Sequence, residues 1–204
     1  MSKRTPEEVL SGPYGSTPRA ADRIFDTARE LFYREGIRAV GVDEIVTRAG
    51  VTKPSLYRSY KSKDELVAAV LREVEAGFWD RFEAAETLYP DDPKAQMVAY
   101  FQGLADRSGG DDYRGCNLSN AVVEYPDRQH AGRQVAQDHK QLLRDRLQTK
   151  AAEMGASDPK AMGDAMMLLI EGVFTSSQMF DGDDKPAKAA VGAVKALIAA
   201  YCPG

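Results

Sequence analysis

Two short apolar repeats separated by a glycine, between residues 42 and 60, constrain the fold of this chain more than any other feature. The first repeat consists of apolar residues at helical spacing, Val42, Ile45, Val46 and Ala49. It stops at Gly50, and a second short segment begins behind Thr52 and runs over residues 53–60. Glycine permits a tight turn that a Cβ atom would obstruct. Two short helices about three residues apart are typical of a helix-turn-helix.

A longer helix is predicted on each side of this unit. Upstream, apolar residues recur at helical spacing at Ile24, Ala28, Leu31 and Phe32. We expect Thr17 to cap this helix, Pro18 to lie in its first turn and Gly36 to end it. Downstream, we expect Ser62 to cap a long amphipathic helix that runs to about Ala85.

The rest of the chain predicts helices and no strands. Helical spacing indicates five further segments, near residues 93–106, 117–124, 128–154, 160–180 and 187–201, and Gly, Pro and Asp residues lie between them. The sequence therefore predicts an all-α protein of about nine helices. We expect a flexible arm over residues 1–17, a three-helix unit over 18–63 and a helical body over 64–204.

The charges are divided unevenly between the two ends of the chain. The net charge is −4, but residues 1–63 hold 12 Lys and Arg against 8 Asp and Glu, whereas residues 64–204 hold 15 against 23. Binding to nucleic acid depends on local positive potential rather than on the total charge. The basic N-terminal part is therefore the predicted place for a double-stranded DNA partner.

The residues after Gly50 suit a helix that enters the major groove of DNA. Such a helix presents its first side chains to base edges while nearby groups bind the phosphates. Lys53 and Ser55 are placed to meet base edges, Thr52 is expected at the cap, and Pro54 suits the first turn. Long cationic or hydrogen-bonding side chains for the phosphates gather nearby, at Arg48, Tyr57, Arg58, Lys61 and Lys63.

The run AGVTKPSLYRSYKSKDEL, residues 49–66, resembles the signature of the tetracycline-repressor (TetR) family of bacterial regulators. The resemblance covers about residues 18–70. It implies DNA contacts for the residues at the matching positions, Thr52, Lys53, Ser55, Tyr57 and Lys63.

Two positions depart from the family pattern. Gly41 stands where the family usually has a Thr or Ser that caps the helix and binds a phosphate, so only a backbone N–H remains for that contact. Tyr60 replaces the usual Phe, so we expect a mainly packed ring whose hydroxyl can donate to the DNA backbone.

The resemblance also implies that the residues from about 85 onward bind a ligand and form a homodimer. The helix near 160–180 is apolar over more than one stripe, and the helix near 187–201 is rich in Ala. We assign both to a four-helix dimer interface, with packing inside a monomer as the alternative. A two-fold dimer requires an inverted-repeat operator with half-sites roughly 34–36 Å apart.

A pocket for a small-molecule effector is expected in the same body. The candidates are aromatic and polar residues that cannot all be exposed: Phe78, Trp79, Phe82, Tyr100, Phe101, Cys116, Asn117, Asn120, Val123, Tyr125 and Gln178. Core packing is the alternative for each of them. Because few charged residues are among them, we expect a mainly apolar or aromatic effector.

The resemblance implies a transcriptional repressor that an effector releases from DNA. An activator, or a DNA-binding protein that does not read sequence, remains an alternative on the same fold. A helical enzyme is less favoured, because His130 and His139 are too far apart for a helical metal site and no phosphate-binding loop or GxSxG motif is present. We expect no metal and no cofactor.

The two cysteines, Cys116 and Cys202, show no CxxC spacing, so free thiols are expected and a redox role of Cys116 stays open. The chain contains no apolar stretch of the roughly 18 residues that a membrane span needs, and its start has no signal-peptide pattern. We expect a cytoplasmic protein.

Overall fold

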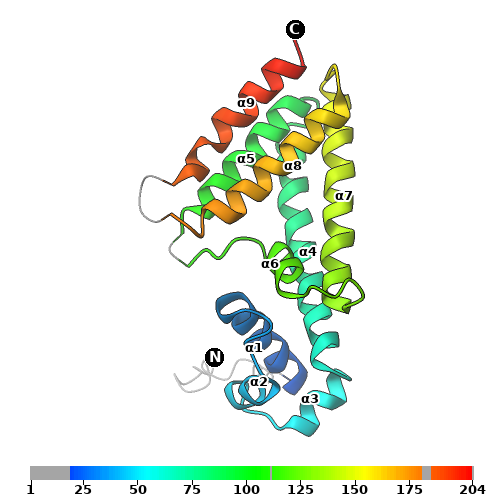
Figure 1. The fold of residues 1–204 in the computed structure, drawn as a ribbon, viewed down its shortest axis with the longest axis vertical. Helices are drawn as coiled ribbons and strands as arrows, with labels where there is room; N and C mark the ends of the chain where they lie inside the picture. The colour runs from blue at the N-terminus through cyan, green and yellow to red at the C-terminus, as the bar shows by residue number, and fades with distance from the viewer. Residues whose placement is uncertain (1–18, 111, 181–184, 204) are drawn as a thin grey trace, which may run out of the picture.

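The computed structural model describes residues 19–110, 112–180 and 185–203. Within these ranges the chain forms nine α-helices and one short 3₁₀ helix, and no strand (Figure 1). The prediction of an all-α fold with about nine helices is confirmed. The N-terminal arm predicted over residues 1–17 lies outside the described residues.

The first three helices form a small bundle at one end of the molecule (Figure 1). They are α1 (Ala20–Glu35), α2 (Val42–Arg48) and α3 (Lys53–Ser59). Their shared core contains fully or almost fully buried apolar side chains, Ile24, Leu31, Ile45 and Leu56. The periodicity in the sequence therefore identified the inner faces of α1 and α2.

The first helix begins at a different residue from the one expected. Its N-cap residue is Arg19, and the Asp22 carboxylate accepts a hydrogen bond of 3.2 Å from the Arg19 backbone N–H. Thr17 and Pro18, the expected cap and first turn, lie outside the described residues. The helix ends at Gly36, whose φ of 92° suits a residue without a Cβ.

The turn between α2 and α3 has the predicted form. Gly50 has a φ of 62°, and the Val51 N–H donates to the Val46 carbonyl at 2.9 Å. Thr52 is the N-cap residue of α3, but its hydroxyl lies 3.1 Å from the Ser55 hydroxyl instead of accepting from the backbone. The helix-turn-helix is therefore present, with a cap that leaves two hydroxyls at the exposed start of α3.

The fourth helix joins the small bundle to the body. It is α4 (Lys63–Leu88), and the Ser62 hydroxyl accepts from the Glu65 N–H at 3.1 Å, as predicted. It extends three residues beyond the predicted end at Ala85. The helices of the body follow: α5 (Pro93–Ser108), α6 (Asn117–Glu124), α7 (Ala131–Glu153), α8 (Pro159–Ser176), the 3₁₀ helix η2 (Pro186–Ala189) and α9 (Ala190–Tyr201).

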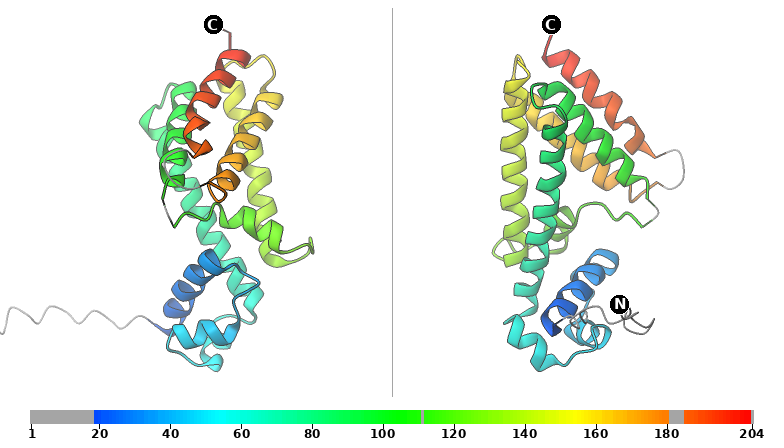
Figure 2. Two further views of the ribbon diagram at one scale, coloured as in Figure 1. Left: turned by 60° about the vertical axis from the view of Figure 1, so that its left-hand side comes forward. Right: turned by 180° about the vertical axis from the view of Figure 1, so that it is seen from behind.

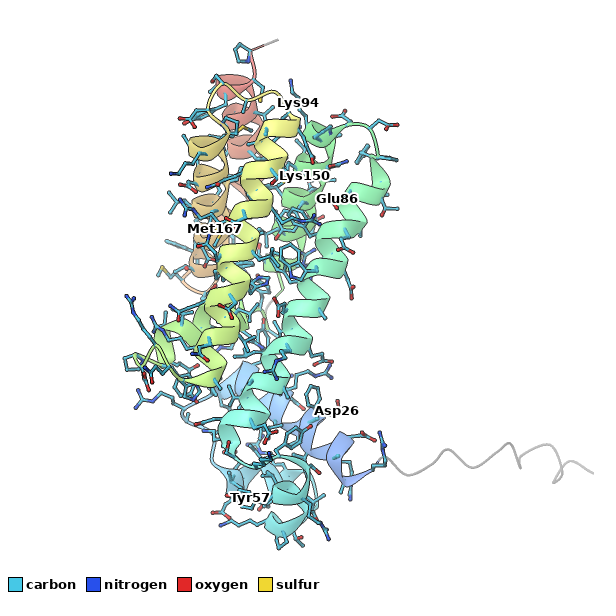
Figure 3. All side chains as sticks on the ribbon, turned by 90° about the vertical axis from the view of Figure 1, so that its right-hand side faces the viewer. Asp26, Tyr57, Glu86, Lys94, Lys150 and Met167 are labelled. Atoms are coloured by element: carbon cyan, nitrogen blue, oxygen red, sulfur yellow. The ribbon has the colours of Figure 1, made fainter. Side chains whose placement is uncertain are left out.

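Two long helices run along the body, and three others pack beside them. Helices α4 and α7 lie side by side, and α5, α8 and α9 form the opposite part of the body (Figures 1 and 2). Lys150 of α7 contacts Glu86 of α4 at 2.8 Å (Figure 3). Gly163 lets α8 approach α7 closely, because a Cβ there would lie 2.7 Å from the Gln148 backbone.

Several helix ends in the body differ from the predictions. The helix expected over 128–154 begins at Ala131, and the one expected over 93–106 ends at Ser108. The helix expected over 160–180 ends at Ser176, and the apolar residues Met179 and Phe180 beyond it are exposed. The helix expected over 187–201 begins as a 3₁₀ turn and becomes α-helical at Ala190.

None of the helices in the described ranges combines the length and apolar character that a membrane span requires. The same residues contain no group of three or more His, Cys, Asp or Glu side chains that could hold a metal ion.

Candidate nucleic-acid interface and internal cavity

The exposed side of α3 lies at the end of the molecule farthest from Lys94 (Figure 3). Lys53, Tyr57 and Arg58 are exposed there, and Tyr57 keeps 49% of its surface accessible. A large aromatic side chain gains stability from burial. Its exposure beside two cations leaves its ring and hydroxyl accessible to a partner on this surface.

The cations of this surface make weak contacts within the protein. Lys53 Nζ lies 2.7 Å from Asp43 Oδ1, and this hydrogen bond together with the Asp43 charge raises the pKa of Lys53. Arg48 lies 2.8 Å from Glu44 and 3.1 Å from Glu35. Exposed ion pairs contribute only about 0–1 kcal/mol, so these side chains can exchange their partners for phosphates at little cost.

Ser55, Arg58 and Pro54 complete the start of α3. The Arg58 guanidinium donates to the Ser55 hydroxyl at 2.9 Å, and Pro54 is exposed in the first turn. The hydroxyl that was predicted to meet a base edge is therefore held by a cation of the same helix.

Lys63 lies apart from the other predicted contacts. Its ammonium donates to the Ile37 carbonyl at 2.6 Å and lies 5.9 Å above the Phe32 ring. Burial lowers its pKa. In this conformation Lys63 joins α4 to the loop after α1, and a DNA contact by this residue stays a prediction.

Tyr60 and Lys61 lie at the junction between α3 and α4. The Tyr60 ring is partly buried against the core, as expected, and burial raises the pKa of its hydroxyl. Lys61 is exposed, and its backbone N–H donates to Glu65 Oε2 at 2.6 Å.

A cavity of about 200 Å³ lies in the body next to α1. Four of the eleven predicted effector contacts line it: Phe78, Tyr100, Cys116 and Asn117. They come from α4, from α5 and from the start of α6. The structure thus brings these four together around one space.

The other seven predicted effector contacts lie elsewhere. Trp79, Phe82 and Phe101 pack with Phe78 and Tyr100 in an aromatic cluster whose ring centroids are 5.0–6.4 Å apart. Three line a separate, more open pocket between α1, α6 and α8: Asn120, Val123 and Gln178. The Tyr125 ring stacks on the His130 ring at 3.6 Å.

Four polar residues that line the cavity were missing from the sequence-based set: Tyr33, Arg81, Arg107 and Tyr113. A signal for two of them exists, because Arg81 follows Phe78 by three positions and Arg107 follows Tyr100 by seven, which places each on the same helix face. Tyr33 belongs to α1, so the cavity is lined in part by the N-terminal bundle.

Hydrogen bonds near the cavity join the body to that bundle. The Arg114 N–H donates to the Tyr33 hydroxyl at 2.7 Å, and the Arg114 guanidinium donates to the Arg34 carbonyl. At the end of α6, Glu124 Oε2 accepts from the Arg38 N–H at 2.7 Å. A residue before α6 therefore holds the last turn of α1, and the last residue of α6 holds the loop that follows α1.

Comparisons with known proteins agree with this arrangement. The family model described as "Bacterial regulatory proteins, tetR family" matches residues 24–70. The crystal structure of SCO4454, a TetR-family transcriptional regulator from Streptomyces coelicolor, has a TM-score of 0.83 and 30% sequence identity, covering 90% of this chain and 96% of that chain. The chain belongs to the TetR family. It is therefore a DNA-binding transcriptional regulator and not an enzyme.

Curated relatives of this TetR-family chain match over shorter segments. The HTH-type transcriptional activator FasR of Mycolicibacterium smegmatis is 53% identical over 50 residues, which are 24% of this chain and 23% of FasR. The HTH-type transcriptional repressor ComR of Escherichia coli is 27% identical over 114 residues, 54% of either chain. The chain thus spans less than two thirds of both relatives.

In this TetR-family protein, α8 and α9 lie beside each other (Figure 2), and each has exposed residues. Leu168 of α8 is 73% exposed. Gly172 of α8 and Gly192 of α9 have open space where a Cβ would stand. Small exposed residues lie at Ala189, the last residue of η2, and along α9 at Ala196, Ala199 and Ala200. These faces present an exposed apolar side chain and a row of small residues, against which another helix can pack closely.

The imidazole of His139 is buried in the body beside the aromatic cluster. It is 0% exposed, and its ring centroid lies 4.6 Å from that of Phe78 and 5.3 Å from that of Trp79. Burial, with a smaller contribution from Lys140, lowers its pKa to about 3. Burial thus outweighs the nearby Glu75 carboxylate, whose Oε1 lies 3.5 Å from Nδ1.

This histidine predicts a stability that falls in acid. Between its ordinary pKa of 6.5 and about 3, the unfolded chain binds a proton that the folded chain does not, so stability decreases as the pH falls. We expect this site to contribute a loss of about 2 kcal/mol in the free energy of unfolding between pH 7 and pH 5. Urea denaturation at both pH values measures it. Between these pH values the free energy of unfolding of the His139→Phe variant should decrease by correspondingly less. If the variant keeps the pH dependence of the native protein, His139 is not its cause.

Proposed function

We propose that this regulator is a homodimeric repressor that binds an inverted-repeat operator and leaves it when a small molecule enters the cavity. The observation that carries the proposal is the position of Tyr33. It lies on α1 of the DNA-binding bundle and lines the cavity of the body. An occupant of the cavity would therefore contact the part of the protein that carries the recognition helix.

Helix α3 would enter the major groove with its exposed start facing the bases. In this arrangement Lys53 and Ser55 read base edges, and Thr52 and Pro54 lie at the groove entrance. Residues around them would bind the phosphates on either side: the exposed Arg48, Tyr57, Arg58 and Lys61, and the hydroxyl of the partly buried Tyr60. The weak ion pairs of Arg48 and Lys53 support this exchange of partners.

The dimer would form by packing α8 and α9 of one subunit against the same helices of the other. A two-fold interface places the same residues on both sides. The exposed Leu168 would pack against the partner subunit, and the small residues of α9 would allow the helices of the two subunits to approach closely. This pairing would fix the distance between the two recognition helices, which an operator with two half-sites requires.

Release would follow from two arrangements of the DNA-binding bundle relative to the body. An occupant shifts the equilibrium only if it binds one arrangement better than the other. Tyr33 and the Glu124–Arg38 hydrogen bond are the contacts that would differ between them. A coupling of about 1–3 kcal/mol is typical of such systems.

The sign of regulation rests on the family resemblance. FasR is named an activator and ComR a repressor, so the fold is compatible with both. An expression reporter behind the bound operator decides between them, because a repressor lowers the expression of that reporter and an activator raises it.

The binding itself is tested by selecting bound sequences from random duplexes and measuring their affinity by fluorescence anisotropy. We expect a palindromic sequence bound at least about 10³-fold more tightly than a scrambled duplex, with a steep dependence on salt. Equal weak binding to both duplexes would overturn the proposal of a site-specific repressor in favour of a protein that does not read sequence.

The Glu124–Arg38 contact gives a prediction about coupling. Replacing Glu124 with Gln removes the charge that accepts the Arg38 N–H. We expect faster amide hydrogen exchange over residues 36–40 and a change in operator affinity of about 3-fold to 10-fold, within the coupling energies usual for allostery.

Glu83→Gln on the exposed side of α4 is the matched control for this prediction. It makes the same change of charge without contacting the bundle. If the backbone amides of residues 36–40 exchange at the same rate in the Glu124→Gln and Glu83→Gln variants, the Glu124–Arg38 contact does not hold this loop.

A further inference from the structure

Two arginines lie at the opening of the cavity. Arg81 of α4 and Arg107 of α5 both line the cavity and reach solvent, which places them at its mouth. Within the described ranges, neither forms an ion pair, whereas Arg144 and Lys150 of the same body pair with carboxylates. The charge of Asp106 also acts on Arg107, but it comes last among the causes that act on the pKa of that residue. The cavity thus holds two positive charges without a paired carboxylate.

None of the described residues that line the cavity is Asp or Glu. Burial and then the charge of Arg81 lower the pKa of Arg107. An anion placed between two guanidinium groups that repel each other at one opening would remove the repulsion.

Behind the arginines the cavity is mainly apolar. Val74, Phe78, Leu104 and Phe174 contribute to its walls. Tyr100 also lines it, and this residue is 4% exposed with a hydroxyl that has no hydrogen-bond partner in the described part of the protein. Leaving a buried hydroxyl unpaired costs about 1–3 kcal/mol. This unpaired group is a second, independent sign that a ligand completes the site.

We propose that the cavity binds a small organic carboxylate with an apolar body, its carboxylate held between Arg81 and Arg107. A cavity of about 150 Å³ holds one benzene molecule, so the present volume of about 200 Å³ suits a single ring, or a chain of similar size, with its carboxylate. Guanidinium groups bind carboxylates through paired hydrogen bonds. The sequence predicted an apolar or aromatic effector. The two arginines indicate that this effector also carries a negative charge. The proposal rests on the proposed function, because it names the class of effector for the same cavity.

The first test compares acids with their uncharged amides on the full-length protein. The probes are benzoate, cinnamate and hexanoate, each paired with its amide, and acetate and inorganic phosphate as anions without an apolar body. Binding is measured by calorimetry and by the fluorescence of Trp79, the single tryptophan, whose ring lies 5.3 Å from Phe78 of the cavity wall. We expect at least one acid to bind at least about 10-fold more tightly than its amide and than acetate or phosphate.

The second test locates the carboxylate. Arg81→Gln and Arg107→Gln should each weaken the binding of that acid by about 10-fold, and the double variant should bind acid and amide equally. Arg72→Gln, on the exposed side of α4, is the matched control and should bind as the native protein does. Two results would overturn the proposal: no acid binding below about 10 mM, or acid binding that survives in the double variant.

Both tests omit DNA, so their outcome is independent of the proposed function. An acid that binds through both arginines but leaves the operator complex intact would support this site and contradict effector release. Release of DNA by an uncharged compound, together with no acid binding, would support the repressor and overturn the carboxylate site.

Discussion

The variant Leu168→Glu is expected to be a monomer of 22.3 kDa and to lose at least about 100-fold of the affinity for a palindromic duplex. Leu168 is the most exposed apolar side chain of α8. In a two-fold interface each substitution places two carboxylates in a buried apolar surface, where unpaired charges are costly. A monomer has a single recognition helix, so it binds one half-site and loses the contacts with the second.

The measurements are light scattering during size-exclusion chromatography, and anisotropy with the selected duplex and with one half-site. Leu142→Glu, at an exposed position of α7, makes the same chemical change outside the two helices of the proposed interface and should stay a dimer. Binding of a single half-site should be the same in native protein and Leu168→Glu. A dimeric Leu168→Glu variant would place the subunit contact on another face.

Local patterns predicted the helices well because their causes are local. The turn at Gly50 and the cap at Ser62 depend on residues within a few positions of each other, and both are present. The end of α8 was misplaced because Met179 and Phe180 continue an apolar pattern that the structure leaves exposed. Periodicity shows which residues are apolar, but it does not show where a facing helix stops.

The cavity was less predictable, because packing between distant helices decides which aromatic rings face each other and which face a space. Phe78 lines the cavity, while Phe82, one turn later on the same helix, is buried in the aromatic cluster. Both are phenylalanines of the same predicted helix, four positions apart, so the sequence pattern does not distinguish them. Arg81 and Arg107 would ordinarily be interpreted as solvated charges, since nothing local shows that α4 and α5 bring them to one opening.

The same limit applies to Lys63. Its place in the family signature indicates a DNA contact, but its ammonium is bonded to the Ile37 carbonyl, 26 positions earlier in the chain. That contact depends on how the loop after α1 docks against α4. A lysine that holds this loop contributes to the position of the bundle, which is a different role from binding a phosphate directly.

The variant Lys53→Ala is expected to weaken binding to the selected duplex by about 1–3 kcal/mol and to relax the preference at one base pair of each half-site. Tyr57→Phe should weaken all sequences alike, by up to about 10-fold, because it removes only a hydroxyl that a phosphate would accept from. The different outcomes follow from the positions of the two residues in the first and second turns of α3. Anisotropy against the selected duplex and its single-base variants measures both.

The far end of the molecule provides matched controls. Lys94→Ala and Tyr89→Phe change an exposed lysine and an exposed tyrosine near the start of α5 (Figure 3 labels Lys94), and both should bind as the native protein does. Because removing Lys53 also leaves Asp43 unpaired at the DNA-facing surface, the double variant Asp43→Asn, Lys53→Ala is needed as well. If the double variant recovers native affinity and base preference, Lys53 acts only by neutralising Asp43. If the changed base preference persists, the lysine reads the base directly.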